Sequence, residues 1–319
     1  MADILVLPTG VHGIPITEYA AALRDRLPEH QIVTAETPAE SQKYISDVTV
    51  ATGRTLDEDL LEEASDKLSM FVCSYAGTGH LPMEAINERE ITVINASGVH
   101  GPNIAEYVIG GILAATHRFN RGRRQQSRRE WRHYPVGELQ GDTVTVVGLG
   151  AIGQAVVARL QGFNVNTIGV RYTPDKGGPT DEVIGLTDQE AFEDALARTN
   201  HLVLATPLTE LTEGLIGHEE FEILPSSATI TNIARGPVID TEALVTALRR
   251  GWIGHAILDV TDPEPLPEDH PLWTFDNVRI TPHNSGYTPQ YYDRLADIVA
   301  TNLRRYENND SLVNTVNNC

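Results

Sequence analysis

The stretch Val144–Gly153, V-T-V-V-G-L-G-A-I-G, decides how this chain folds. Its first four residues are an apolar, β-branched run typical of a strand that is buried on both faces. Gly148, Gly150 and Gly153 follow with G-x-G-x-x-G spacing, and a helical stretch comes next. In that setting the glycines permit a tight turn, a close approach to a pyrophosphate and close packing of helix on strand. The stretch therefore predicts a dinucleotide site at a helix N-terminus rather than a plain glycine turn.

Length and composition indicate a globular protein of two domains. The chain has 319 residues, of which 41% are hydrophobic, and this is long for one domain. No apolar run approaches the ~20 residues that a membrane-spanning helix needs. The N-terminus lacks a basic region followed by a long apolar one, so we expect no export signal. Two cysteines, Cys73 and Cys319, cannot form a disulfide framework. We therefore expect a cytoplasmic location and no membrane partner.

The charge balance is strongly acidic. There are 44 Asp and Glu residues against 24 Lys and Arg, which gives a net charge of −20, and the lysines are Lys43, Lys67 and Lys176 alone. Such a field repels nucleic acid and anionic membranes, so we expect no nucleic-acid partner. High charge with almost no lysine is similar to the composition of cytoplasmic proteins from extreme halophiles, in which molar salt screens charges to within ~3 Å. We interpret it as salt adaptation rather than ordinary acidity.

Short apolar runs alternate with helical stretches along the whole chain, which predicts parallel βαβ units. We expect a fold of class α/β with two doubly wound parallel-sheet domains. The expected strands are 4–7, 31–34, 48–51, 70–73, 92–95, 144–147, 166–170, 201–205, 228–232, 256–260 and 278–281. The expected helices are 15–27, 39–45, 57–65, 83–88, 103–116, 154–160, 188–197, 241–250 and 289–306.

The segment 99–140 is the expected contact of a homodimer. Helix 103–116 is too apolar to lie bare on a surface, so we expect it to be buried between domains or subunits. Arginines then gather at positions 118, 121, 123, 124, 128, 129 and 132. One interpretation is an anion or nucleotide patch. We favour a connector whose arginines pair with acidic surface, on a second subunit in the dimer.

Arg171 stands where the residue that selects the cofactor is expected. An acidic side chain there binds the ribose 2′-hydroxyl of NAD, whereas an arginine accommodates the 2′-phosphate of NADP. A guanidinium offers paired N–H donors to phosphate oxygens, and Tyr172 and Thr173 add hydroxyl groups. The sequence predicts that NADP(H) is preferred and that NAD(H) can also serve.

Four motifs in order give the chain a family resemblance. The glycine motif is followed by Asn232–Pro237, N-I-A-R-G-P, then by Leu258–Leu266, L-D-V-T-D-P-E-P-L, and Thr281–Gly286, T-P-H-N-S-G. Together they resemble the D-isomer-specific 2-hydroxyacid dehydrogenase family over nearly the whole chain. The resemblance implies a discontinuous, flavodoxin-like substrate domain of residues 1–98 plus 288–319. It also implies a Rossmann-type cofactor domain of residues 99–287.

The resemblance implies that the catalytic residues are Arg235, Glu264 and His283. A guanidinium holds the carboxylate of a small 2-oxoacid and polarises its carbonyl. An imidazolium protonates the alkoxide that hydride transfer leaves, giving a D-2-hydroxyacid, and a neighbouring carboxylate orients the ring. Ala76, Gly77, Arg235 and His283 would bind substrate. The remaining implied positions contact the cofactor: Gly148, Gly150, Ala151, Ile152, Gly153, Arg171, Tyr172, Thr173, Ala205, Thr206, Pro207, Thr212, Asn232, Ile233, Ala234, Asp259, His283 and Gly286.

Three features limit or test this interpretation. Tyr107 stands where the family often has a histidine, a position outside the reaction. The run His218–Glu222 lacks H-E-x-x-H spacing, so we expect a solvated helix face and no metal. A formate dehydrogenase is disfavoured because those relatives have glutamine at the position of Glu264. A phosphite dehydrogenase and a non-catalytic, NAD(P)-sensing protein similar to transcriptional corepressors remain as alternatives.

Overall fold

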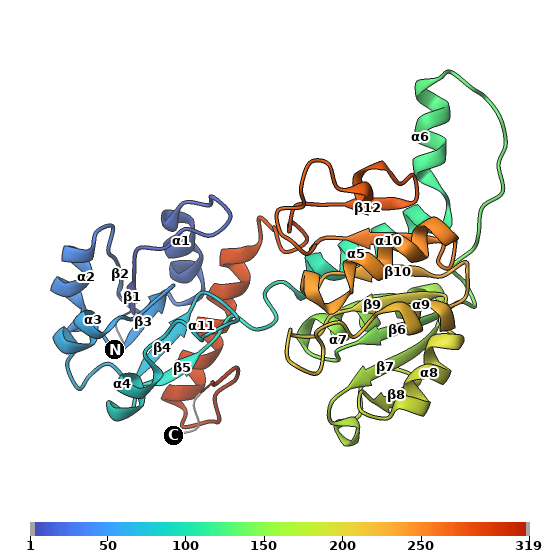
Figure 1. Ribbon diagram of the computed structural model, residues 1–319. Coiled ribbons are helices and arrows are strands. Elements are labelled where there is room, and N and C mark those ends of the chain that lie inside the picture. The colour runs from blue at the N-terminus through green and yellow to red at the C-terminus, as the bar shows by residue number, and fades with distance from the viewer. Residues whose placement is uncertain (1–3, 317–319) are drawn as a thin grey trace. The chain divides into compact units, whose positions relative to one another are not determined.

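The computed structural model describes residues 4–316 and divides into two compact units (Figure 1). One unit runs up to His100 and resumes at Tyr287, whereas Gly101–Gly286 forms the other. The chain thus leaves the first unit once and returns to it once. In the part of the chain that the structure describes, no helix is both long and apolar enough to cross a membrane.

The terminal unit is built on a five-stranded parallel sheet with the order β2-β1-β3-β4-β5. This is the flavodoxin-like order, in which the order of the strands along the sheet reverses between β1 and β3 while all strands stay parallel. Its strands are β1 (Ile4–Val6), β2 (Ile32–Thr34), β3 (Val50–Gly53), β4 (Met70–Cys73) and β5 (Thr92–Ile94).

Helices cover both faces of this sheet because its strands are apolar on both sides. Ile4 and Val6 pack into one core with residues of α1 (Ile16–Arg26) and α11 (Tyr291–Glu307). Leu5 points the other way, into a second core with the remaining helices. These are α2 (Pro38–Ile45), α3 (Glu58–Glu63) and α4 (Met83–Glu88).

The Gly101–Gly286 unit contains a seven-stranded parallel sheet with the order β12-β11-β10-β9-β6-β7-β8. The order reverses between β6 and β9, as it does in a Rossmann-type sheet. Its strands are β6 (Thr143–Val147), β7 (Asn166–Arg171), β8 (Glu182–Gly185), β9 (His201–Leu204), β10 (Thr229–Asn232), β11 (His255–Leu258) and β12 (Val278–Ile280). Both units are α/β with parallel sheets, which confirms the expected fold class.

Helices α5 (Gly101–Thr116) and α7 (Ala151–Leu160) share one core with Val144 and Val146 of β6. The opposite core holds Val147 with residues of α8 (Gln189–Ala197), α9 (His218–Ile223) and α10 (Thr241–Arg250). Helix α5 is expected from the sequence to be buried between domains or subunits, but its apolar residues pack into the core of its own unit, against β6 and α7. The 3-10 helices are Gln161–Phe163, Pro174–Lys176, Gly236–Val238 and Pro271–Thr274.

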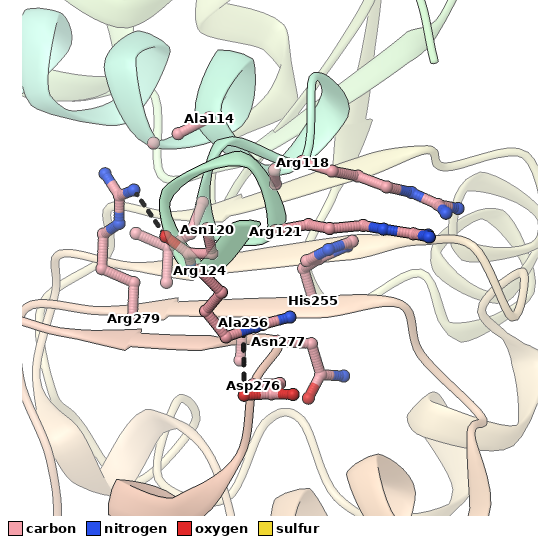
Figure 2. Close-up of a pocket in the computed structure, with 13 residues that line it drawn as sticks. Ala114, Arg118, Asn120, Arg121, Arg124, His255, Ala256, Asp276, Asn277 and Arg279 are labelled. Carbon is pink, nitrogen blue, oxygen red and sulfur yellow. Dashed lines mark hydrogen bonds and ion pairs between the residues drawn. The ribbon is translucent and has the colours of Figure 1, made fainter. Parts of the chain in front are cut away.

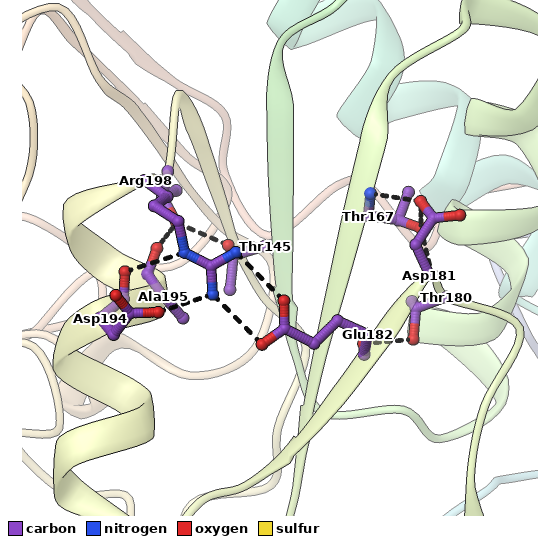
Figure 3. Close-up of polar contacts among 9 residues, drawn as sticks. Thr145, Thr167, Thr180, Asp181, Glu182, Asp194, Ala195 and Arg198 are labelled. Atoms are coloured by element: carbon purple, nitrogen blue, oxygen red, sulfur yellow. Dashed lines mark hydrogen bonds and ion pairs between the residues drawn. The ribbon is translucent and has the colours of Figure 1, made fainter.

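The sequence does not predict two elements of this unit, one helix and one strand. The arginine-rich connector contains a helix, α6 (Phe119–Ser127), which buries no side chain. Strand β8 is short and buries only Ile184, so it lacks the apolar run of a central strand. Polar contacts hold it instead: Arg198 pairs with Glu182 at 3.1 Å, and the Asp181 carboxylate accepts from the Thr167 amide and hydroxyl groups at 2.8 Å (Figure 3).

Candidate active site

The predicted residues of the Gly101–Gly286 unit follow the carboxyl ends of its strands. Gly148 follows β6, Arg171 ends β7, and Arg235 lies shortly after β10. Glu264 lies in the loop after β11 and His283 in the loop after β12. Because all seven strands are parallel, their carboxyl ends line one edge of the sheet, which is where such folds bind ligands.

The glycine turn is shaped by close backbone packing. Gly148 has φ +100°, and a Cβ built on it would lie 2.6 Å from the carbonyl oxygen of Ala205. A Cβ on Gly153 would lie 1.9 Å from the carbonyl oxygen of Gly148. No side chain fits at either position. These contacts are the tight turn and the close helix packing that the motif requires.

Gly150 differs from its two neighbours in the motif because it faces open space. A Cβ built on it would meet no heavy atom within 4 Å. Gly150 is the N-cap of α7, which has no side-chain cap and no acidic residue in its first turn. The N-terminal N–H groups of α7 are thus left for an anionic ligand, so the turn fits a dinucleotide pyrophosphate.

A cavity of about 490 Å³ extends from this turn to the end of β7. No carboxylate is among its lining residues. Arg171 contributes the one charged side chain to the lining, and its guanidinium donates to the carbonyl oxygen of Gly177. The cavity brings together eight predicted cofactor residues: Gly148, Gly150, Arg171, Tyr172, Thr173, Thr206, Pro207 and Thr212.

The other predicted cofactor residues lie outside this lining. Ala151 and Ile152 begin α7, and Ala205 follows β9. Asn232 shapes the next turn, because its side chain donates to the carbonyl oxygen of Arg235 at 2.9 Å and accepts from the amide of Ala234 at 3.0 Å. The last three positions are on neighbouring loops: Ile233, Asp259 and Gly286.

His283 and Glu264 form a direct pair. Nδ1 of His283 lies 2.8 Å from Oε1 of Glu264, and the two side chains are 49% and 43% exposed. With Nδ1 on the carboxylate, Nε2 is the ring nitrogen left to face a substrate. Arg235 is also exposed and its guanidinium donates to the carbonyl oxygen of Ala234 at 2.6 Å. The site therefore offers a cation and a carboxylate-oriented imidazole.

Asp259 organises the loop that carries His283. Its side chain is buried, 1% exposed, and accepts from the hydroxyl of Thr281 at 2.6 Å. It also accepts from the amides of Asn284 at 2.8 Å and Ser285 at 2.9 Å. The sequence predicts a cofactor contact for Asp259, but no local pattern indicates that its carboxylate also organises this loop. Thr281 belongs to the same network, and its place in the motif Thr281–Gly286 is its only sign in the sequence.

Comparison with known proteins gives this site a context. A model of the family described as D-isomer specific 2-hydroxyacid dehydrogenase, NAD binding domain, matches residues 109–285. The chain belongs to this family.

Similar proteins include two named enzymes and one relative with a solved structure. A glyoxylate reductase of Thermofilum pendens is 35% identical over 78% of this chain and 74% of its own length. A D-3-phosphoglycerate dehydrogenase of Methanocaldococcus jannaschii is 33% identical over 95% of this chain, which spans only 58% of that relative. A dehydrogenase of this family from Xanthobacter autotrophicus Py2, solved with NADPH and MES, is 26% identical, with TM-score 0.77 over 99% of this chain and 98% of its own.

Two of the predicted substrate residues, Ala76 and Gly77, belong to the terminal unit. Ala76 and Gly77 lie in the exposed loop after β4. The side chain of Asn95 donates to the carbonyl oxygen of Ala76 at 2.8 Å, which fixes the turn. A Cβ on Gly77 would meet no heavy atom within 4 Å. Their part in binding substrate stays a prediction.

The arginine-rich segment lines a different cavity, of about 280 Å³, at the amino ends of β11 and β12 (Figure 2). Arg124 pairs with Asp276 at 2.9 Å, whereas Arg118 and Arg121 extend past His255. Within residues 4–316, no carboxylate forms an ion pair with either of these two arginines. Burial and the charge of Arg118 lower the pKa of His255.

The cluster at His218 has ordinary helix contacts. Its imidazole lies 3.9 Å from the Glu222 carboxylate one turn along α9 and edge-on to Trp252. Among the described residues, no three metal-ligating side chains are close enough together to hold a metal ion.

The two contrasting glycines of the turn give a matched pair of variants. We expect Gly150→Ala to fold normally and to weaken NAD(P)H binding about tenfold, or ~1.4 kcal/mol, because the methyl group enters the space before α7. We expect Gly153→Ala to destabilise the unit by at least about 3 kcal/mol, because its methyl group overlaps backbone. Thermal midpoints and fluorescence titration measure both effects. Normal stability of Gly153→Ala would contradict the packing.

Proposed function

We propose that this protein is a D-2-hydroxyacid dehydrogenase that reversibly reduces a small 2-oxoacid with NADPH. The observation that carries the proposal is the 2.8 Å pair between His283 Nδ1 and Glu264, on the sheet edge that also bears the glycine turn. A glyoxylate reductase and a phosphoglycerate dehydrogenase among the relatives support the substrate class.

The proposed chemistry divides between Arg235, His283 and Glu264. When bound, a nicotinamide dinucleotide would provide the hydride that C2 of the 2-oxoacid takes up. Arg235 pairs with the substrate carboxylate and polarises the neighbouring carbonyl group, which stabilises the negative charge that develops on its oxygen. Nε2 of His283 donates the proton that this oxygen takes up, while Glu264 holds the ring and stabilises the imidazolium. In the oxidation direction the same nitrogen accepts the proton.

Each unit has a proposed role in this reaction. The cofactor domain, predicted as residues 99–287, binds the dinucleotide through the glycine turn and the 490 Å³ cavity. The substrate domain, predicted as residues 1–98 plus 288–319, contributes the backbone amides of Ala76 and Gly77 to the substrate carboxylate. The exposed position and open surroundings of Gly77 support this second assignment.

Loss of the proposed acid should abolish turnover without loss of binding. We expect His283→Ala to lower kcat at least 100-fold, in line with the 10²–10⁴-fold that general acids contribute, with NADPH binding retained. The measurement is the loss of absorbance of NADPH when glyoxylate, hydroxypyruvate, pyruvate or 2-ketoisocaproate is added. His218→Ala is the control, since that exposed histidine also pairs with a glutamate. Full activity of His283→Ala would refute the assignment.

Two alternative functions make different predictions in the same assay. A non-catalytic, NAD(P)-sensing protein would bind NADPH and turn over no 2-oxoacid. A phosphite dehydrogenase would reduce NADP with phosphite as the donor. The Arg235, Glu264 and His283 set is compatible with both, so the proposal depends on turnover of a 2-oxoacid.

We propose that NADPH is preferred and that NADH also serves. Arg171 is the charged residue at the far end of the cofactor cavity, whose lining holds no carboxylate to bind a ribose 2′-hydroxyl. Tyr172, 73% exposed, and Thr173 extend the same edge. The Xanthobacter relative was solved with NADPH.

Reversal of the charge at position 171 should therefore reverse the preference. We expect Arg171→Asp to raise the KM for NADPH at least tenfold, by removing a charged partner of the 2′-phosphate, and to change the KM for NADH much less. Steady-state rates with both cofactors give the comparison. Arg249→Asp, an exposed site at the end of α10, makes the same charge change elsewhere. Equal increases in the KM for NADPH and the KM for NADH would contradict the proposed role of Arg171.

We also propose a homodimer through residues 99–140. Helix α6 buries no side chain, and Phe119 and Trp131 are 56% and 96% exposed. Arg118 and Arg121 have no carboxylate partner in the described chain, and a second copy with net charge −20 offers many. The same acidic composition supports a cytoplasmic protein that is adapted to molar salt.

The dimer and the salt adaptation can be tested together. Light scattering in molar KCl should give the mass of a dimer, and a double variant, Arg118→Glu with Arg121→Glu, should shift it toward the monomer. The thermal midpoint should rise from low to molar KCl, because salt screens the repulsion among acidic side chains. A wild-type monomer would refute the dimer, and a midpoint that does not rise would refute the salt adaptation.

A further inference from the structure

Helix α5 contacts the loop of His283 at two points. Asn103 donates from Nδ2 to the carbonyl oxygen of Ser285 at 2.7 Å. The hydroxyl of Tyr107 lies 2.6 Å from Oγ1 of Thr281. These two helix residues are four positions apart and so share one face of α5. The helix therefore touches the loop on both sides of His283.

The hydrogen bond of Tyr107 has a definite direction. Thr281 has one hydroxyl proton, and it donates this proton to Oδ1 of Asp259 at 2.6 Å. Tyr107 must then donate to Thr281 Oγ1, which still has lone pairs to accept. Burial raises the pKa of Tyr107, so its hydroxyl keeps the proton that it donates. The result is a directed chain from Tyr107 through Thr281 to Asp259.

Asp259, the last member of this series of hydrogen bonds, contacts the backbone of the loop at His283, where that backbone is strained. His283 has φ +50°, in the left-handed region that residues other than glycine rarely adopt. Its amide donates to the carbonyl oxygen of Asp259 at 2.8 Å, while the Asp259 carboxylate accepts from the amides of Asn284 and Ser285. Asp259 thus fixes the backbone at His283 and at the two residues after it, and so fixes the point from which the imidazole projects.

We propose that Tyr107 is a positioning residue for His283, acting through Thr281 and Asp259 to keep the imidazole on Glu264. The inference rests on the proposed function, because it assumes that His283 moves the proton. Tyr107 is half-buried, and within residues 4–316 its hydroxyl is hydrogen-bonded to this loop at Thr281. Removing that oxygen leaves the Thr281 hydroxyl without its donor and loosens the hold on Asp259.

The test compares two tyrosine hydroxyl groups. We expect Tyr107→Phe to lower kcat about tenfold and to leave the KM for NADPH within about twofold, since the change weakens proton transfer and not cofactor binding. Tyr19→Phe is the matched control. Tyr19 is fully buried in the terminal unit, and its hydroxyl lies 2.7 Å from Oγ1 of Thr52, in a second tyrosine–threonine pair. The control should lower the thermal midpoint and leave kcat unchanged.

A double-mutant cycle separates positioning from general loss of stability. If Tyr107 acts through Thr281, adding Tyr107→Phe to Thr281→Val should lower kcat no further. Multiplicative losses in the double variant would overturn the proposal, as would a kcat for Tyr107→Phe equal to that of the wild type.

A measurement that needs no turnover distinguishes failure of the inference from failure of the proposed function. Amide hydrogen exchange at Asn284 and Ser285 should be at least tenfold faster in Tyr107→Phe than in the wild type, and unchanged in Tyr19→Phe. If no 2-oxoacid is reduced by the wild type, the proposed function fails, and exchange still reports on the loop. Unchanged exchange in Tyr107→Phe would overturn the inference in either case.

Discussion

The parallel direction of seven strands is the constraint on which the site of the Gly101–Gly286 unit depends. Hydrogen bonding fixes the register from β12 to β8, so the loops that follow the strands emerge at one edge. Glu264 and His283 are 19 residues apart, yet they meet because β11 and β12 are neighbours. The reversal of strand order between β6 and β9 leaves room beside the glycine turn. The parallel sheet thus places the loops that carry the site residues at one edge.

Backbone contacts set the loops at this edge more than side-chain packing does. Gly148 approaches Ala205 so closely that a Cβ would overlap its carbonyl group, and Gly153 packs on Gly148 in the same way. Further along the edge, one buried carboxylate, that of Asp259, accepts from two loop amides and a hydroxyl group. Such contacts leave the loops little freedom, which suits a reaction whose geometry must be held.

Charge is distributed unevenly in this acidic chain. The cavity that holds the glycine turn is lined by one arginine and no carboxylate, although the whole chain carries −20. A second group of arginines lies at the amino ends of β11 and β12, on the opposite edge of the sheet. An anionic ligand in the cavity beside the glycine turn would therefore meet no repelling carboxylate among the lining residues, despite the acidity of the chain as a whole.

The sequence by itself determined the α/β class, most strand positions and the family, because buried strands, G-x-G-x-x-G and the later motifs are local patterns. It missed β8 and α6, since β8 buries one side chain and α6 none, which leaves no periodic apolar signal. It named His283 and Glu264 through resemblance, but only the tertiary structure brought their side chains to 2.8 Å. The series of hydrogen bonds from Tyr107 through Thr281 to Asp259 was decided by the tertiary structure alone. Hydrogen bonds between residues 174 positions apart depend on packing, which no local pattern records.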